Sequence, residues 1–75
     1  MENHVTLLSL NELARELKIN KSKLSYYSSI KLIVPANTVG KMMIFNGVET
    51  IERVKKIEKL RKSGLTLQEI KEKLN

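Results

Sequence analysis

The segment Ile19-Asn20-Lys21-Ser22-Lys23-Leu24-Ser25-Tyr26-Tyr27 decides the fold of this 75-residue chain. We expect it to form a short basic helix that begins just after another short helix has ended. Between Leu17 and Val48 every charged residue is a lysine. Folded domains usually mix charges of both signs on their surface. A contiguous stretch without carboxylates therefore indicates a surface that faces a polyanion, and nucleic acid is the first candidate.

The length and composition exclude several classes of protein. A chain of 75 residues forms one small domain, 1–75, with a modest core and no enclosed active-site cavity. There is no cysteine, and we expect the single histidine, His4, to be a solvated bystander, so no metal or other cofactor is expected. No carboxylate pair, activated nucleophile or phosphate-cradling glycine loop is visible, and we therefore expect no enzyme.

The charge and hydropathy of the chain indicate an acidic partner rather than a membrane. The formal net charge is +6 and the pI is about 9.8. The longest apolar run, Leu32-Ile33-Val34, is too short to span a bilayer, and no signal peptide is visible. We expect a bacterial-type cytoplasmic protein that is associated with the nucleoid when it binds DNA.

The first predicted helix covers about residues 10–17. Ser9-Leu10-Asn11-Glu12 has the form of a capping box, in which the serine and the glutamate each accept the other's backbone N–H. Apolar residues then follow at the spacing of one helical face: Leu10, Leu13, Ala14 and Leu17.

The second predicted helix covers about residues 21–29. Lys18 and Ile19 form a turn, Asn20 is a suitable N-cap, and Leu24 and Tyr27 are the expected inward residues. We expect the Tyr27 ring to fix this helix against the first one. Two short helices joined by such a turn indicate a helix-turn-helix, although two ordinary packed helices fit the spacing equally well.

A β-hairpin is predicted at about residues 32–45. The apolar runs Leu32-Ile33-Val34-Pro35 and Met42-Met43-Ile44-Phe45 flank a loop near Asn37 and Gly40. Pro35 indicates an edge element, because proline cannot donate to a central sheet.

Two further helices are predicted at about residues 47–63 and 67–74. Asn46-Gly47-Val48-Glu49 offers an N-cap, and Thr66-Leu67-Gln68-Glu69 is another capping box. Gly64 fits the position after the third helix. The inward face of the third helix is expected to comprise Val48, Ile51, Val54, Ile57 and Leu60. The fold class is therefore mostly α with a small β-hairpin wing.

Three motifs carry a resemblance to a known family. Leu24-Ser25-Tyr26-Tyr27 is similar to a Leu-Arg-Tyr-Tyr motif, and Lys31-Leu32-Ile33-Val34-Pro35 stands where that family has Gly-Leu-Leu-x-Pro. The segment 60–70 is similar to Leu-Arg-x-x-Gly-x-Ser-Leu-x-x-Ile. From about Leu8 to Leu74 the chain thus resembles the DNA-binding domain of the MerR family of bacterial transcription regulators. The resemblance implies a MerR-like winged helix-turn-helix that binds double-stranded DNA with a sequence preference.

This resemblance also implies which residues meet DNA. The second helix would enter the major groove, where lysine contacts guanine acceptors or phosphates, and Tyr26 would offer its hydroxyl to a phosphate. Lys41 would lie at the wing tip, while Met42 and Met43 would pack within the wing. Arg61 and Lys62 flank the turn before the fourth helix, which is a second wing in the family. The rest of the basic run in residues 53–62 would be the outer face of the third helix. The predicted DNA-contacting residues are Lys21, Ser22, Lys23, Ser25, Tyr26, Lys41, Arg61 and Lys62.

Departures from the family pattern keep alternatives open. Ser25 replaces the family's arginine, Ser28 a glutamate, Lys31 a glycine, and Met43 and Phe45 the wing arginine and tyrosine. These losses would suit a protein-interaction module that has lost DNA binding. An excisionase-like architectural DNA binder of a mobile element is a further alternative. The family's long dimerisation helix is not in this sequence, so the chain is either a piece of a longer protein or a stand-alone domain. A homodimer would use a region absent from this chain or another surface.

Overall fold

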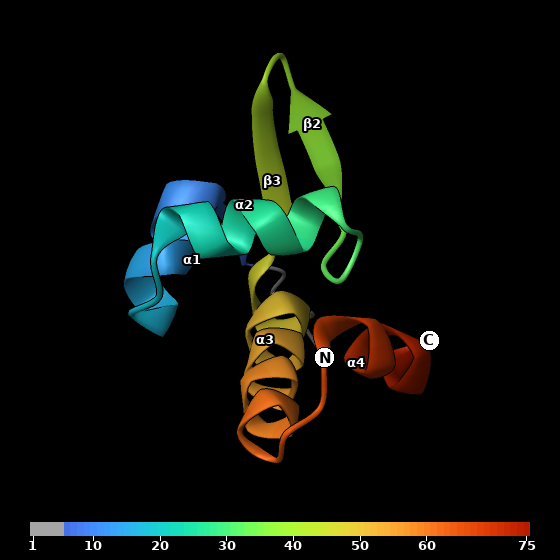
Figure 1. Cartoon of the computed structure of the whole chain (residues 1–75). Helices are drawn as coiled ribbons and strands as arrows, with labels where there is room; N and C mark the ends of the chain where they lie inside the picture. The colour runs from blue at the N-terminus through green and yellow to red at the C-terminus, as the bar shows by residue number, and fades with distance from the viewer. Residues whose placement is uncertain (1–5) are drawn as a thin grey trace, which may run out of the picture.

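The computed structural model describes residues 6–75, so His4 lies outside the described part. Within that range the elements follow in the order β1 (Leu7–Ser9), α1 (Leu10–Leu17), α2 (Lys21–Ser29), β2 (Asn37–Val39), β3 (Met42–Asn46), α3 (Gly47–Lys62) and α4 (Leu67–Leu74). The hairpin of β2 and β3 projects from the body beyond α2, and α3 extends in the opposite direction with α4 beside it (Figure 1). The prediction of a mostly α fold with a small hairpin wing is confirmed.

A three-residue turn joins α1 to α2. The capping box of α1 is present, with the Glu12 N–H donating to Ser9 Oγ and the Ser9 N–H donating to Glu12 Oε1. The helix ends at Lys18, whose φ of 57° is left-handed, and the Ile19 N–H donates to the Ala14 carbonyl at 3.1 Å. This reversal of the chain brings α2 across α1.

The sheet is antiparallel, with β3 in the middle. Leu8 of β1 is paired with Phe45 of β3, and Thr38 of β2 is paired with Met43 on the other side. The sequence did not predict β1, because three residues are too few to show an alternating pattern. This strand ties the start of α1 to the base of the wing.

The first arm of the wing was predicted in the wrong place. Leu32 and Ile33 form no strand; they are 0% and 1% exposed in the core. The N–H groups of both residues donate to the Tyr27 carbonyl, so this apolar run closes the C-terminal end of α2. A short apolar run looks the same in sequence whether it pairs with a strand or fills a core from a loop.

The hairpin therefore begins later and is shorter than predicted. Its first arm is the wholly exposed strand Asn37–Val39, which the sequence had assigned to the loop. The turn lies at Gly40 and Lys41, and Gly40 has a left-handed φ of 62° that glycine adopts without steric cost. Lys41 consequently lies at the tip of the wing.

The start of α3 explains its glycine. Asn46 caps the helix by accepting the Glu49 N–H at 3.1 Å. At the next position, a Cβ on Gly47 would lie 3.0 Å from both Leu8 Cδ1 and the Thr6 carbonyl oxygen. A side chain here would require Leu8 or the backbone at Thr6 to move, so glycine suits this close approach of α3 to the segment before α1. The predicted inward position of Val48 was wrong, since its side chain is 56% exposed.

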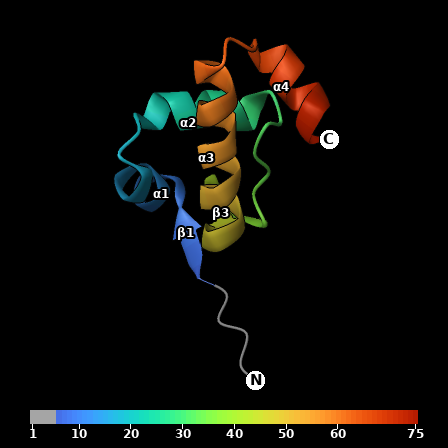
Figure 2. The same ribbon diagram turned by 90° about the horizontal axis from the view of Figure 1, so that it is seen from below.

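The core lies where the four helices and the base of the wing meet. The capping box of α4 is present at Thr66 and Glu69. Figure 2 shows α3 running through the middle, with α1 on one side and α4 at its C-terminal end. In residues 6–75 no helix is long and apolar enough to cross a membrane. The buried apolar residues are Leu13, Leu24, Tyr27, Leu32, Ile33, Phe45, Val54, Ile57 and Ile70.

Lys31 occupies a strained backbone position. Its φ is 64°, in the left-handed region, directly after α2 has ended. A side chain with a Cβ costs roughly 1–2 kcal/mol in this conformation, and glycine avoids that cost. The glycine of the similar family motif at this position thus has a conformational reason, and this chain keeps the turn despite the lysine.

We expect Lys31→Gly to raise the free energy of unfolding by about 0.5–1 kcal/mol. The gain is smaller than the strain because glycine also has more freedom in the unfolded chain. Lys31→Ala is the matched control: it removes the same charge but keeps the Cβ, so its stability should stay near that of the wild type. Urea denaturation followed by circular dichroism measures both. Equal stabilisation by alanine and glycine would show that charge, not backbone strain, matters here.

Candidate nucleic-acid interface

The exposed face of α2 is polar and carries no acid. Asn20 caps the helix by accepting the Ser22 N–H at 2.7 Å, and the first turn contains no acidic residue. Leu24 and Tyr27 are fully buried, which leaves Lys21, Ser22, Ser25 and Tyr26 on the outside. Tyr26 is 53% exposed and has its hydroxyl available to a partner. This face offers hydroxyl groups and an ammonium to an anionic ligand.

The wing and the start of α2 border one hollow. It has a volume of about 500 Å³ and is lined by both Lys21 and Lys41 together with the start of α1 and the wing residues Val39, Met42 and Met43. The two lysines belong to elements twenty residues apart in sequence, so the fold brings them together. No acidic side chain lines this hollow.

The side chains at the substituted wing positions turn inward. Phe45 is fully buried in the core, and Met43 is partly buried, with its sulfur accepting the Ser28 hydroxyl at 3.3 Å. These residues fasten the wing to α2. Met42 does not pack in this way, contrary to expectation, because its side chain is 56% exposed.

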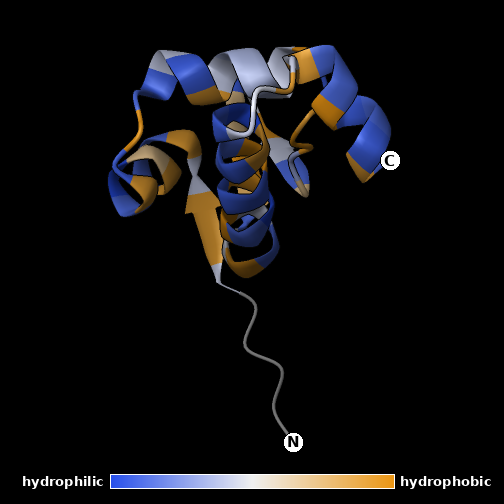
Figure 3. Ribbon diagram, turned by 60° about the horizontal axis from the view of Figure 1, so that its bottom comes forward, coloured by the Kyte–Doolittle hydropathy of each residue, from blue (hydrophilic) through white to orange (hydrophobic). Residues whose placement is uncertain are grey.

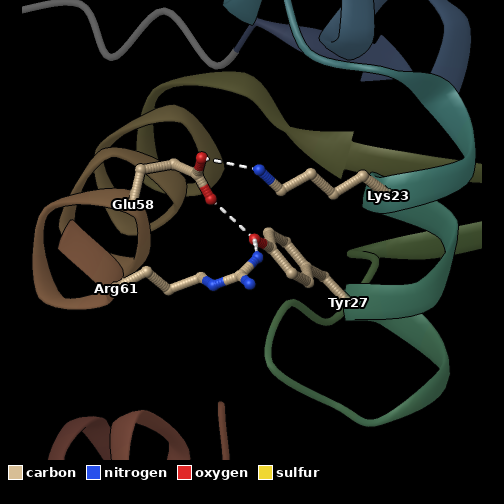
Figure 4. Close-up of polar contacts among 4 residues, drawn as sticks. All are labelled: Lys23, Tyr27, Glu58 and Arg61. Atoms are coloured by element: carbon tan, nitrogen blue, oxygen red, sulfur yellow. Dashed lines mark hydrogen bonds and ion pairs between the residues drawn. The ribbon is translucent and has the colours of Figure 1, made fainter. Parts of the chain in front are cut away.

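A polar cluster joins α2 to α3. Lys23 Nζ donates to Glu58 Oε1 at 2.8 Å, and the Tyr27 hydroxyl donates to Glu58 Oε2 at 2.6 Å. The guanidinium of Arg61 donates to the same tyrosine oxygen at 3.4 Å. Figure 4 shows all four side chains converging in the space between the two helices. We call these residues the Glu58 cluster.

The charges within the cluster favour its ionised form. Partial burial disfavours the charged Glu58 carboxylate, but the hydrogen bonds from Lys23 and Tyr27 and the positive charges nearby outweigh burial and lower its pKa. The hydrogen bond to Glu58 raises the pKa of Lys23. Burial, and then the hydrogen bond to Glu58, raises the pKa of Tyr27. At neutral pH the cluster therefore contains an ammonium, a guanidinium, a carboxylate and a neutral phenol.

Glu58 is the residue that sequence reasoning missed. The carboxylate was assigned with its neighbours to the outer face of α3, but it points to α2. It also changes the expected environment of Tyr27, whose hydroxyl is bonded to α3. The sequence contained one sign of this role, because Glu58 is the single acid in the basic run 53–62. Helical periodicity alone does not show which helix lies opposite such a residue.

Arg53 also departs from the predicted outer face. Its side chain donates to the Leu32 carbonyl and to Asn75 Oδ1, so it ties the segment after α2 to both α3 and the end of the chain. The truly outward part of α3 mixes charges: Glu49 and Glu52 line the same hollow as Lys55, Lys56 and Lys59. In Figure 3, hydrophilic stretches alternate with hydrophobic ones along α3 and α4, as expected for helices with one face in the core.

The remaining predicted residues lie at the C-terminal end of α3. Arg61 belongs to the Glu58 cluster and is therefore adjacent to α2. Lys62 lines a separate hollow with Leu17 and Ile19, between α3 and the end of α1. In the described residues 6–75, no group of His, Cys, Asp and Glu side chains could hold a metal ion.

We expect Glu58→Gln to lower the free energy of unfolding by about 1 kcal/mol at pH 7. The substitution replaces the carboxylate of a partly exposed ion pair with a neutral amide. The lowered pKa of Glu58 fixes the pH dependence. The stabilisation is present above the unfolded-state pKa and is lost as the pH falls through the folded-state value. Thermal unfolding of both proteins at pH 7 and pH 3 measures the difference. A gap that is as large at pH 3 would contradict an electrostatic origin.

Comparison with known proteins agrees with this geometry. A family model described as MerR HTH family regulatory protein matches residues 8–75. Neither the curated proteins nor the solved structures gave a significant match. The matched segment contains the whole helix-turn-helix, the wing, and both helices that support them. The chain belongs to the MerR family of helix-turn-helix regulatory proteins, which are DNA-binding regulators of transcription.

Proposed function

We propose that this domain binds double-stranded DNA with a sequence preference, placing α2 in the major groove and the wing on the backbone. The observation that carries this proposal is the shared hollow of Lys21 and Lys41, which has no acidic lining. One duplex could contact both lysines at once, because they belong to the same surface. A polyanion is the ligand that such a surface fits best.

The exposed residues divide into reading and positioning roles. Ser22 and Ser25 offer hydroxyl groups to base edges, and Lys21 can reach guanine acceptors or a phosphate. Tyr26 and Lys41 have the exposure needed to contact phosphates, which fix the register of the protein on the duplex. Lys23 differs from these residues, because Glu58 already holds its ammonium.

A second contact region is proposed at the turn between α3 and α4. Arg61 and Lys62 end α3, and the N–H groups in the first turn of α4 follow shortly after. Arg61 is exposed and lies next to α2 through its bond to the Tyr27 hydroxyl. The backbone on the other side of the major groove is the expected partner.

We expect Lys21→Glu with Lys41→Glu to remove most DNA binding while leaving the helical circular dichroism signal intact. Fluorescence anisotropy with a labelled duplex at about 50–200 mM salt gives the slope of log affinity against log salt. Each phosphate contact contributes about −0.9 to that slope, so the double variant should lose about 1.8 units.

The matched control is Lys56→Glu with Lys73→Glu. It makes the same change in net charge on exposed positions of α3 and α4, away from the shared hollow. The control should keep the wild-type slope within about 0.5 units. Equal losses in both variants would show a diffuse charge effect and no α2–wing interface. Enrichment of one sequence from a random duplex pool tests the sequence preference. If the wild type is folded but shows no salt-dependent DNA binding, a protein-interaction module is favoured instead.

A further inference from the structure

Glu58 places a carboxylate in the basic half of α3, where it faces α2. It is the only acid between Glu52 and Glu69, a segment otherwise rich in lysine and arginine. Both of its oxygens accept hydrogen bonds from α2, one from Lys23 and one from Tyr27. A negative charge beside a polyanion-binding helix weakens the attraction. The two bonds to α2 indicate another role for Glu58.

We propose that Glu58 is a positioning residue that withholds Lys23 from the DNA phosphates and fixes α2 through Tyr27. This inference rests on the DNA binding proposed above. Its basis is geometric: Lys23 lies on the reading helix, but its ammonium turns back toward α3 and its side chain is only 35% exposed. The cation is also 6.0 Å from the centre of the Tyr27 ring, so it lies over the core-facing part of α2.

Movement of Lys23 to a phosphate would be unfavourable. It would leave the Glu58 carboxylate, itself only 29% exposed, without its cation and close to the negative charge of DNA. Arg61 donates to the Tyr27 oxygen and would not replace the lost ammonium contact without leaving its own partner. The ion pair is therefore expected to persist in the complex.

Withholding this cation changes the balance between strength and selectivity. Phosphate contacts raise affinity for every sequence, whereas contacts with base edges distinguish sequences. With Lys23 held by Glu58, the first turns of α2 present Lys21 and the hydroxyls of Ser22 and Ser25. The domain gives up one sequence-independent contact on the helix that reads the bases.

The test is a double-mutant cycle in the salt dependence of DNA binding. The four proteins are wild type, Lys23→Met, Glu58→Gln and the double variant, each with the same random-sequence duplex. Methionine retains most of the lysine stem, and the glutamine amide oxygen can still accept the Tyr27 hydroxyl. We expect Glu58→Gln to steepen the slope by about 0.9, the value for one added phosphate contact. Lowering the salt from 1 M to 0.1 M would then raise the affinity of the Glu58→Gln variant by about eight-fold more than it raises that of the wild type.

Coupling between the two substitutions is the decisive quantity. Lys23→Met should make the salt dependence shallower, and this change in slope should be about 0.9 units larger in the Glu58→Gln background than in the wild-type background. A purely structural role for Glu58 would change stability without this coupling. Glu52→Gln removes one carboxylate from the exposed surface of the same helix and should not reproduce the steepening.

Three results would overturn the inference. Equal effects of Lys23→Met in both backgrounds would mean that Lys23 contacts phosphate regardless of Glu58. No effect in either background would mean that released Lys23 does not reach DNA. A wild type without salt-dependent binding would defeat the proposed function and this inference together, whereas the first two results defeat the inference alone.

Discussion

The contact of Tyr27 with Glu58 holds α2 against α3. The tyrosine ring is fully buried, and its hydroxyl emerges at the carboxylate of α3 with a separation of 2.6 Å. A buried ring gives apolar contact area, and a single polar tip fixes its orientation. The same tyrosine carbonyl accepts the N–H groups of Leu32 and Ile33, which lead the chain toward the wing. Tyr27 thus contacts α3 through its hydroxyl and, through its backbone carbonyl, the segment that leads to the wing.

The sequence predicted the elements that local chemistry specifies. Both capping boxes, at Ser9 and at Thr66, fixed helix starts because the bonding partners lie three residues apart. The loop residues Leu32 and Ile33 could not be assigned, because their burial depends on what lies opposite them. The role of Glu58 was hidden for the same reason, since its partners are 31 and 35 residues away in the chain. Long-range packing decides such positions, and one sequence contains no direct record of it.

Several departures from the family pattern now have a structural reading. Met43 and Phe45 exchange two wing positions for packing against α2 and the core. Lys31 keeps a left-handed turn that glycine would make more easily. These changes leave the architecture intact, and Lys21 and Lys41 line one hollow between α2 and the wing. In the proposed complex these two lysines supply the cationic contacts. The arrangement suits an interface in which few charges contact the backbone and the hydroxyls of α2 face the bases.

Mapping of the bound surface by NMR tests the central claim most directly. The amide resonances of the ¹⁵N-labelled protein would be followed during titration with a short duplex at two salt concentrations. Salt-sensitive shifts should concentrate at the start of α2 and at the wing tip around Lys41, with small changes on the outer face of α3 around Lys56. Shifts confined to α3 and α4, or no shifts at low salt, would contradict an interface built from α2 and the wing.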